Sequence, residues 1–592
     1  MKNQAKNIGI ALFLAVIAYS FLQGAISHWH KVLIWDLVDS DDTMRVLQVR
    51  AWLDGQGFYD LLNHRSNPPF GASMHWSRLA DLPLALLQIL LRPLFGNVQA
   101  EHIAVFAVPP MLGLIYVWLL GLAAKHLSGT WFSPFFAIVL FTFSVSATYN
   151  FVPGRVDHHG LQLICFAAFL LGLVQNTVKG GVIAGISLGA SLTIGFEMLP
   201  LQILAVTWLA LIWGLAGAAR KDQVIGFCMA FAIATLFGFF LNVAPNAYFA
   251  QTNDALSIAQ LVTIFVGALG FGITAQKTSE RSFRLRFLTL GLIAILVVLC
   301  ALQFQELFKP LYWQTSEILR TKWLLTNGEV IPMMQRPILD QLAVGVMLLL
   351  ALPVVFVQIF SHKARNAEWW LLAILLLGAS GLAFFYQTRF HFQATTIAIL
   401  VLAAVLPKIL SPKSSAIALA VMAIAAPFAH TKLKQAANEK IGHNNAKYAF
   451  NGVKKCRTTR DFAALSAQPK GLLTTNLDLG ALALITTPHD VLGTAYHRDF
   501  GKEYMYHILI SKPVIAQTQI RAHSVDYLAY CASDVDIDAI AEFAPNGLMA
   551  QLLAGKIPAY LQPIPNQNDS HIVAFKVARA VDVQLERQLG SN

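Results

Sequence analysis

Charge is scarce in this chain of 592 residues. Only 13% of the residues are charged and 56% are apolar. Soluble globular proteins have roughly twice this charge density. The shortage excludes a disordered chain, a collagen-like chain and a nucleic-acid binder, and it indicates an integral membrane protein. The net charge of +11 fits this class, because membrane proteins retain Lys and Arg on their cytoplasmic side.

Nucleotide-binding loops and cysteines are scarce as well. The C-terminal region contains no GxGxxG or GxxxxGK[ST] loop, so an ATP-driven machine is not expected. The chain has 5 cysteines, of which Cys456 and Cys531 lie in that polar region. A disulfide between them and two free thiols are both compatible with the sequence.

Long apolar windows predict about thirteen transmembrane helices. The first window follows Lys2 and Lys6 and is expected to remain as an uncleaved span. The stretch 82–96 is shorter and is interrupted at Arg92-Pro93, which favours an interfacial or re-entrant segment. The expected spans are 8–28, 103–124, 132–151, 160–178, 180–198, 200–218, 223–243, 256–275, 287–304, 338–360, 369–386, 391–407 and 414–429.

Basic residues collect on one side of these spans. With the N-terminus in the cytoplasm, the loops on that side hold many Lys and Arg and few acids, as the positive-inside rule requires. The opposite side receives the long loops 29–102 and 305–337 and the C-terminal tail. We therefore expect a transmembrane domain over 1–430 and a periplasmic domain over 431–592, in a bacterial-type inner membrane.

The tail alternates short apolar runs with helical stretches, which predicts a small α/β domain. Turn residues separate these segments, as at Pro488-His489-Asp490. The apolar runs are Leu472–Thr475, Ala481–Thr486 and Tyr527–Tyr530, and a helical stretch covers Asp534–Phe543.

The first outer loop carries a group of carboxylates, namely Asp36, Asp39, Asp41 and Asp42. Like charges this close need a cation, a shared proton or free water. One interpretation is a solvated loop in which Asp39 or Ser40 caps a helix. The other is a divalent-metal or general-base site.

The same loop continues with aromatic and polar residues that include His75 and Arg78. Aromatic faces suit sugar rings, and Asn, Asp and Arg side chains suit hydroxyls or phosphates. An aromatic belt at the membrane interface is the alternative for the Trp residues taken singly.

A second outer connection reads Arg155-Val156-Asp157-His158-His159. Asp and His offer hard oxygen and borderline nitrogen ligands. Adjacent His residues on a loop do not face one point without a turn, so only one of the two is expected to act as a ligand or donor. The alternative is that Asp157 caps the next helix.

Three further residues lie at outer span ends or loops. Glu197 closes an apolar span, where an ionisable residue is a functional candidate and interfacial snorkelling is the alternative. Glu329 lies in the loop 305–337, and Arg389 at a span end suits a lipid phosphate or a headgroup anchor. One topology places all these groups on one face, and we expect the acids to converge in one pocket at its rim.

In these motifs the chain resembles the GT-C superfamily of membrane glycosyltransferases, and in plan the catalytic subunit of oligosaccharyltransferases. The family's first motif resembles Asp-Pro-Tyr-Tyr-x-x-Arg. The segment from Asp39 to Arg45 keeps the leading Asp and the Arg. The second family motif is acidic, and this chain has His158 and His159 at that place. The tail lacks the Trp-Trp-Asp motif, so nothing indicates an Asn-x-Ser/Thr acceptor.

The resemblance implies roles for the residues quoted above. The catalytic carboxylate would be Asp39, Asp41 or Asp42, and the metal ligands would come from Asp39, Asp157, His158 and Glu329. Contacts to donor or acceptor would come from the remaining polar residues, which are His75, Arg78, Arg155, His159, Glu197 and Arg389.

The implied reaction moves a sugar or oligosaccharide from a polyprenyl-phosphate or -diphosphate donor to a protein, lipid or glycan acceptor on the periplasmic face. An outer Asp would act as base for an inverting attack, and cationic groups with a divalent Mg or Mn ion would stabilise the leaving phosphate, without a nucleotide cofactor. The alternatives are a transporter or flippase of lipid-linked sugars, a polysaccharide ligase or polymerase, and a non-catalytic scaffold. Charges at span ends and the lack of internal symmetry favour an enzyme.

Overall fold

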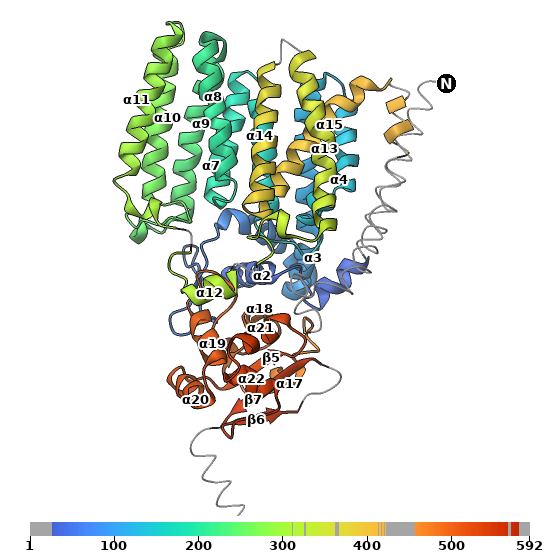
Figure 1. Ribbon diagram of the computed structural model, residues 1–592, viewed down its shortest axis with the longest axis vertical. Coiled ribbons are helices and arrows are strands. Elements are labelled where there is room, and N and C mark those ends of the chain that lie inside the picture. Colours follow the sequence, from blue (N-terminus) through green and yellow to red (C-terminus); the bar gives the residue numbers. More distant parts are fainter. Residues whose placement is uncertain are drawn as a thin grey trace, which may run out of the picture. The chain divides into compact units, whose positions relative to one another are not determined.

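The computed structural model describes residues 26–310, 312–324, 327–361, 366–411, 414–415, 417–419, 421, 456–565 and 570–578. The expected spans 8–28 and 414–429 lie largely outside the described residues. The chain divides into two compact units (Figure 1). The helical unit comprises Met1–His28, Trp76–Leu311 and Asn327–Lys440, and the mixed unit comprises Trp29–His75, Tyr312–Thr326 and Ile441–Asn592.

The helical unit confirms a polytopic membrane protein. Among the described residues, 8 helices are long and apolar enough to cross a bilayer. They are α3 (Arg78–Ser128), α8 (Leu199–Ala216), α9 (Ala218–Asn242), α10 (Ile258–Thr278), α11 (Phe283–Ala301), α13 (Ile338–Ser361), α14 (Asn366–Phe385) and α15 (His391–Ile409), the last extended by the 3-10 turn η6 (Thr388–Phe390). Shorter apolar helices are α4 (Phe132–Phe143), α6 (His159–Leu173) and α7 (Val178–Ile194).

Two expected segments differ in detail from the observed helices. The stretch 82–96 is part of α3, which is interrupted at Gly96, where φ is 76° and the backbone leaves the helical region. The expected span 132–151 is divided at Ser144 into α4 and the short helix α5 (Val145–Tyr149). Ser144 is extended and its hydroxyl accepts the Ala147 N–H, so it caps α5 and ends the continuous helix.

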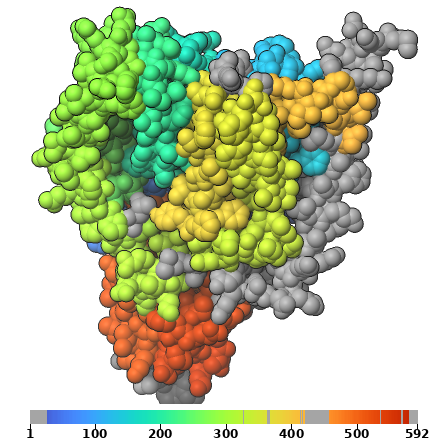
Figure 2. Space-filling model, turned by 45° about the horizontal axis from the view of Figure 1, so that its top comes forward, coloured from blue at the N-terminus to red at the C-terminus, as the bar shows by residue number. Residues whose placement is uncertain are grey.

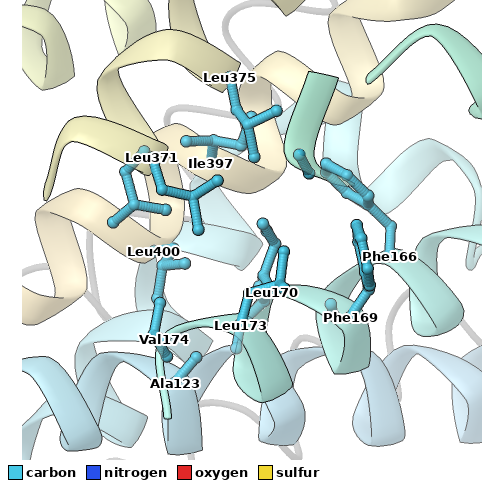
Figure 3. Close-up of a cluster of buried hydrophobic side chains, with 14 of the residues drawn as sticks. Ala123, Phe166, Phe169, Leu170, Leu173, Val174, Leu371, Leu375, Ile397 and Leu400 are labelled. Atoms are coloured by element: carbon cyan, nitrogen blue, oxygen red, sulfur yellow. The ribbon is translucent and has the colours of Figure 1, made fainter. Parts of the chain in front are cut away.

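The core of the helical unit is a tightly packed apolar cluster. Phe166 and Leu170 of α6, Leu371 of α14 and Leu400 of α15 belong to one cluster of buried side chains, and none of the four is accessible to solvent (Figure 3). The apolar side chains of α11 are mostly exposed, as expected of a lipid-facing helix. Figure 2 shows α13 and α14, in yellow, on the surface of this unit, where they pack against each other.

Helices α7 and α9 approach each other closely through glycines. A Cβ atom on Gly181 would lie 2.1 Å from the Gln223 carbonyl oxygen, and one on Gly185 would lie 2.4 Å from the Phe227 carbonyl oxygen. The four-residue spacing puts both glycines on one face of α7. Small residues at this spacing let membrane helices pack backbone to backbone.

The mixed unit contains a five-stranded sheet with the order β4-β3-β5-β7-β6. Strands β3, β4 and β5 are parallel, and β7 pairs antiparallel with both β5 and β6. Six helices accompany the sheet, so the C-terminal α/β fold is confirmed. The strands are β3 (Leu472–Thr474), β4 (Asp490–Val491), β5 (Tyr527–Cys531), β6 (Leu561–Ile564) and β7 (Ile572–Val577), and the helices are α17 (Ala463–Ser466), α18 (Leu477–Thr486), α19 (Gly501–Ile510), α20 (Pro513–Ala522), α21 (Val535–Phe543) and α22 (Leu548–Leu553).

The apolar run Ala481–Thr486 is helical and belongs to α18, whereas Leu472–Thr475 and Tyr527–Tyr530 match strands. Short apolar runs do not distinguish a buried strand from one side of a buried helix. Here the run continues a helix that begins at Leu477, directly after the Asn476 cap.

Residues 29–75, the first part of the expected outer loop 29–102, fold together with the C-terminal sheet. Helix α2 (Ser40–Leu53) of this segment packs against α18, and the segment continues through the hairpin β1 (Leu62–Asn63) and β2 (Ala72–Ser73). Arg65 donates to the carbonyl oxygens of Leu484, Thr487 and His489 at 2.8, 2.9 and 2.5 Å.

The segment around Ser66 extends this sheet at its β4 edge. Ser66 forms a parallel bridge with Val491, whose N–H donates to the Arg65 carbonyl oxygen at 2.8 Å. Such pairing satisfies the exposed edge of a strand. The short helix α12 (Glu317–Lys322) also joins the mixed unit, because Leu319 is buried in its apolar core.

Candidate active site

A group of ionisable side chains gathers where α6 begins in the helical unit. Both imidazoles there bond the Asp157 carboxylate: His158 Nδ1 lies 2.5 Å from Oδ1, and His159 Nδ1 bonds Oδ2. All three residues are buried. The expectation that only one of the two His residues would bind is therefore wrong, because the first turn of α6 directs both rings to the same carboxylate.

Asp157 does not cap the helix in the expected way. The N-cap position is His158, which makes no side-chain capping bond. The Asp157 carboxylate instead accepts the His158 backbone N–H at 2.7 Å and both imidazoles. The carboxylate therefore orients two potential ligand side chains.

Glu197 joins this cluster from the connection between α7 and α8. Its Oε1 lies 2.9 Å from His158 Nε2, and its Oε2 accepts the side-chain amide of Gln162. Gly195 makes room for this arrangement, because a Cβ atom there would lie 2.6 Å from Glu197 Oε2. His158 thus lies between the carboxylates of Asp157 and Glu197.

Glu329 and Arg155 complete the cluster from other segments. Arg155 Nη2 lies 3.7 Å from Asp157 Oδ2 and 3.6 Å from Glu329 Oε1. The Arg155 guanidinium also lies over the Tyr149 ring, 5.2 Å from its centroid. The backbone of Arg389 lies beside that of Glu329, because the Arg389 N–H donates to the Glu329 carbonyl oxygen. Residues from four distant segments are therefore brought together.

The opposite charges in this cluster stabilise one another's ionised forms. Burial lowers the pKa of His158, but the adjacent Asp157 and Glu197 carboxylates outweigh it and raise that pKa to about 10. Burial likewise acts to raise the pKa of Asp157 and Glu197, but the His158 imidazolium holds both well below their usual range. At neutral pH His158 carries a proton and the two acids are ionised.

The cluster has donors suited to a divalent metal ion. Single ligand atoms of Asp157, His158 and His159 lie within 4.8 Å of one another. His159 Nε2 is buried and makes no hydrogen bond within the described part of the chain, and it lies 4.0 Å from Glu329 Oε2. Two ligands about 2.0–2.2 Å from one ion can span such a gap. Oxygen and imidazole donors together suit Mn²⁺ or Zn²⁺, and carboxylates alone suit Mg²⁺.

Trp76 and Arg78 lie at the beginning of the segment Trp76–Leu311 of the helical unit. The Trp76 ring lies 6.0 Å from the His158 ring, centroid to centroid. Arg78 is buried and its Nη1 lies 3.1 Å from Asp81 Oδ2, an i,i+3 pair in the first turn of α3. The pair fixes Arg78 in the structure, and its predicted substrate contact stays a prediction.

The acids of the first outer loop lie in the mixed unit, at the start of α2. Asp39 is the N-cap, and its Oδ1 accepts the N–H groups of Asp41 and Asp42. Asp42 is fully buried and its carboxylate accepts the Asp39 N–H at 3.1 Å. This capping box confirms helix capping by Asp39. The catalytic and metal-binding roles of Asp39, Asp41 and Asp42, and their convergence with Asp157, stay predictions.

His75 also belongs to the mixed unit. Its N–H donates to the Tyr496 hydroxyl at 3.0 Å, its ring bonds the same hydroxyl, and the two rings stack. The His497 ring meets His75 edge-on, with 4.7 Å between centroids. His75 therefore sits in an aromatic group that joins the first loop to the C-terminal domain.

Two residues of functional interest were not predicted from the sequence. Gln162 is fully buried and bonds Glu197, one turn after His158 on α6. The i+4 spacing of a polar residue after His158 is the signal that could have found it. Arg457 contacts the start of α2, and no local pattern in the sequence distinguishes it from an ordinary exposed base.

Comparison with known proteins identifies the fold. No family model matches the sequence, and no curated protein matches it. The archaeal oligosaccharyltransferase AglB from Archaeoglobus fulgidus, in complex with an inhibitory peptide and a dolichol-phosphate, is similar with a TM-score of 0.65 and 13% identity, over 94% of this chain and 73% of that chain.

Two further structures of the Archaeoglobus fulgidus oligosaccharyltransferase agree with this match. The apo form gives a TM-score of 0.63 at 14% identity, over 94% of this chain and 73% of that chain. A complex with Zn and sulfate gives 0.56 at 13% identity, over 92% and 71%. The predicted fold, similar to that of these oligosaccharyltransferase structures, is confirmed.

Proposed function

We propose that this membrane protein is a glycosyltransferase that moves a sugar or oligosaccharide from a polyprenyl-phosphate or -diphosphate donor to an acceptor on the periplasmic face. The cluster of Asp157, His158, Glu197 and Glu329 is the observation that carries the proposal. Buried groups with opposed pKa shifts are typical of functional sites. The fold shared with AglB, which was solved with a dolichol-phosphate, supports a lipid-linked donor.

We assign metal binding to Asp157, His159 and Glu329. His158 is assigned as a positioning residue, because its protonated ring donates to both Asp157 and Glu197 and has no free lone pair for the predicted metal binding. Of the expected Mg²⁺ and Mn²⁺, the buried Nε2 atom of His159 and the nearby Glu329 carboxylate fit Mn²⁺ better, because it accepts imidazole as well as oxygen donors. When bound, the ion supplies positive charge for the leaving phosphate. Arg155 orients the Asp157 and Glu329 carboxylates toward each other, and Gln162 fixes Glu197 against His158.

Asp39 or Asp41 is assigned as the general base that takes the acceptor proton, on the strength of the family resemblance. Asp42 is the weaker candidate, because it is buried and its carboxylate completes the capping box. Arg389 is assigned to the donor phosphate, to which a guanidinium can donate two parallel hydrogen bonds. The acceptor is a protein, lipid or glycan, and the lack of a Trp-Trp-Asp motif gives no support to an Asn-x-Ser/Thr sequon.

The proposal is tested with the full-length protein in proteoliposomes that contain labelled polyprenyl-phosphate- and polyprenyl-diphosphate-linked sugars, supplied with protein, lipid and glycan acceptors. We expect sugar transfer that is lost with EDTA and restored by Mn²⁺ or Mg²⁺. Glu329→Gln should lower transfer at least about tenfold, since it removes a carboxylate from the cluster. Asp222→Asn, which changes an exposed acid on α9, serves as the matched control. Movement of intact labelled donor across the vesicle without cleavage would instead establish a flippase.

A further inference from the structure

Arg457 holds the acid-rich start of α2 in the mixed unit. Its Nη2 donates to the Val38 carbonyl oxygen at 3.1 Å, and its Nε lies 3.7 Å from Asp36 Oδ1. Val38 directly precedes Asp39, the N-cap of α2. The guanidinium therefore contacts the backbone that carries Asp39 and Asp41.

The backbone of Arg457 is itself anchored by a covalent bond. The preceding residue, Cys456, forms a disulfide with Cys531, which is the last residue of β5. Both cysteines are fully buried, and β5 lies in the middle of the five-stranded sheet. The Cys531 N–H also donates to the Asn476 side chain, just before α18. The disulfide thus connects the most enclosed strand of the domain to the residue that contacts α2.

Arg457 interacts with acids from two segments, Asp36 before α2 and Asp478 in α18. Asp478 in the first turn of α18 interacts electrostatically with Asp39, with Asp534 and Asp536 after β5, and with Arg457. Burial and the carboxylates of Asp536, Asp534 and Asp39 raise the pKa of Asp478, whereas Arg457 acts to lower it. Arg457 therefore favours the ionised form of this acid, on the helix that packs against α2. Lys would keep the charge but would not reproduce the planar donor set of Arg.

We infer that Arg457, fixed in place by the Cys456–Cys531 disulfide, is a positioning residue for the catalytic carboxylate at the start of α2. This inference rests on the proposed function. Its consequence is that sugar transfer requires the oxidised disulfide. A dithiol reductant would transfer two electrons and two protons to the cysteines and become a disulfide itself. An extracytoplasmic domain is the place where such a disulfide persists.

The positioning role can be tested without any substrate. Amide hydrogen exchange is measured on the full-length protein for wild type, Arg457→Gln, Arg457→Lys and the double variant Cys456→Ser/Cys531→Ser. Because the hydrogen bond from the charged guanidinium is lost, the amides of Asp41 and Asp42 should exchange at least about tenfold faster in Arg457→Gln. Arg460→Gln, an exposed base three residues away, is the control and should leave exchange unchanged.

The double Cys variant should show the same increase in the exchange rates of the Asp41 and Asp42 amides. The exchange rates in Arg457→Lys should lie between those of wild type and Arg457→Gln. Melting temperatures measured in parallel identify any variant that has lost its global fold. Unchanged exchange at the first turn of α2 in folded Arg457→Gln would overturn the inference.

Kinetics then separate positioning from a general structural role. We expect kcat to fall at least about tenfold in Arg457→Gln while KM for the lipid-linked donor stays within about twofold, because the contact is to the acid-bearing helix. In a background where the catalytic Asp is already replaced, Arg457→Gln should cause no further loss. The double Cys variant, which lacks the buried disulfide, should show the same fall in kcat as Arg457→Gln.

The outcomes distinguish this inference from the proposed function. If wild type transfers no sugar from any donor, the proposed function fails, and the exchange data still decide whether Arg457 holds α2. If wild type is active and folded Arg457→Gln keeps the wild-type kcat, the inference fails alone.

Discussion

Replacing Asp157 with Asn should disable the cluster with the least change in shape. The Asp157 carboxylate accepts hydrogen bonds from the imidazoles of His158 and His159 and lies 3.7 Å from Arg155 Nη2. An amide keeps one acceptor and presents an NH₂ group to the other imidazole, whose Nδ1–H then has no acceptor. The variant therefore loses at least one charge-assisted bond and the negative charge that orients both rings.

The expected magnitude follows from those contacts. Hydrogen bonds to charged groups contribute about 1.5–3 kcal/mol each, and removing one member of a buried ion pair costs about 3–5 kcal/mol. If about 3 kcal/mol of this loss appears in the transition state, kcat falls by about a hundredfold. Part of the loss should also appear as a lower melting temperature, because His158 is left with Glu197 alone as its carboxylate partner.

The assay is steady-state sugar transfer together with thermal unfolding of the purified full-length protein. Asp222→Asn removes one negative charge from an exposed position on α9 and controls for the change in net charge. The reasoning would be refuted if Asp157→Asn kept kcat within about threefold of wild type and melted at the same temperature. Such a result would mean that the observed contacts of Asp157 contribute neither to catalysis nor to stability.

Three further changes probe other parts of the structure. Gly195→Ala should lower kcat at least about tenfold, because the new Cβ would lie 2.6 Å from Glu197 Oε2, whereas Gly291→Ala has no neighbour within 4 Å and should be silent in the same transfer assay. Arg65→Ala should lower the melting temperature by about 2 °C or more, since the guanidinium serves three carbonyl oxygens, and a wild-type melting curve would contradict this. Burial and the neighbouring acids raise the pKa of Asp478 to about 8, above its value of 3.8 when unfolded. The stability that protonated Asp478 contributes is therefore fully present below about pH 4 and is lost as the pH rises through 8. Asp478→Asn should therefore melt above wild type at pH 8.5 and show little difference at pH 4, and an equal difference at both pH values would show that the carboxyl group is not responsible.

Hydropathy located the membrane helices because lipid imposes a length and a composition on each span. It did not reveal how each helix packs. Ile295 of α11 and Ile399 of α15 are the same residue in similarly apolar runs, yet Ile295 is 56% exposed and Ile399 is fully buried. The difference comes from neighbouring helices, which a single sequence does not specify.

The sequence located part of the candidate site because ionised side chains are energetically unfavourable beside an apolar membrane span. Glu197 and Asp157 were recognisable because an acid beside an apolar span needs a partner. Gln162 was missed because an uncharged amide is tolerated in a helix without a special role. Arg457 was missed because an Arg in a polar segment is common, and its contact with Val38 depends on a fold that unites residues hundreds of positions apart.

Phosphorus NMR of the donor tests the central claim most directly. The wild-type protein is placed in vesicles with a polyprenyl-phosphate- or polyprenyl-diphosphate-linked sugar, Mn²⁺ and protein, lipid and glycan acceptors. As the sugar passes to an acceptor, the sugar-phosphate resonance of one of these donors should convert into that of the free polyprenyl phosphate or diphosphate. Asp157→Asn should slow this conversion by about a hundredfold. An unchanged phosphorus signal with every donor, from protein shown to be folded, or equal rates for wild type and Asp157→Asn, would contradict the account.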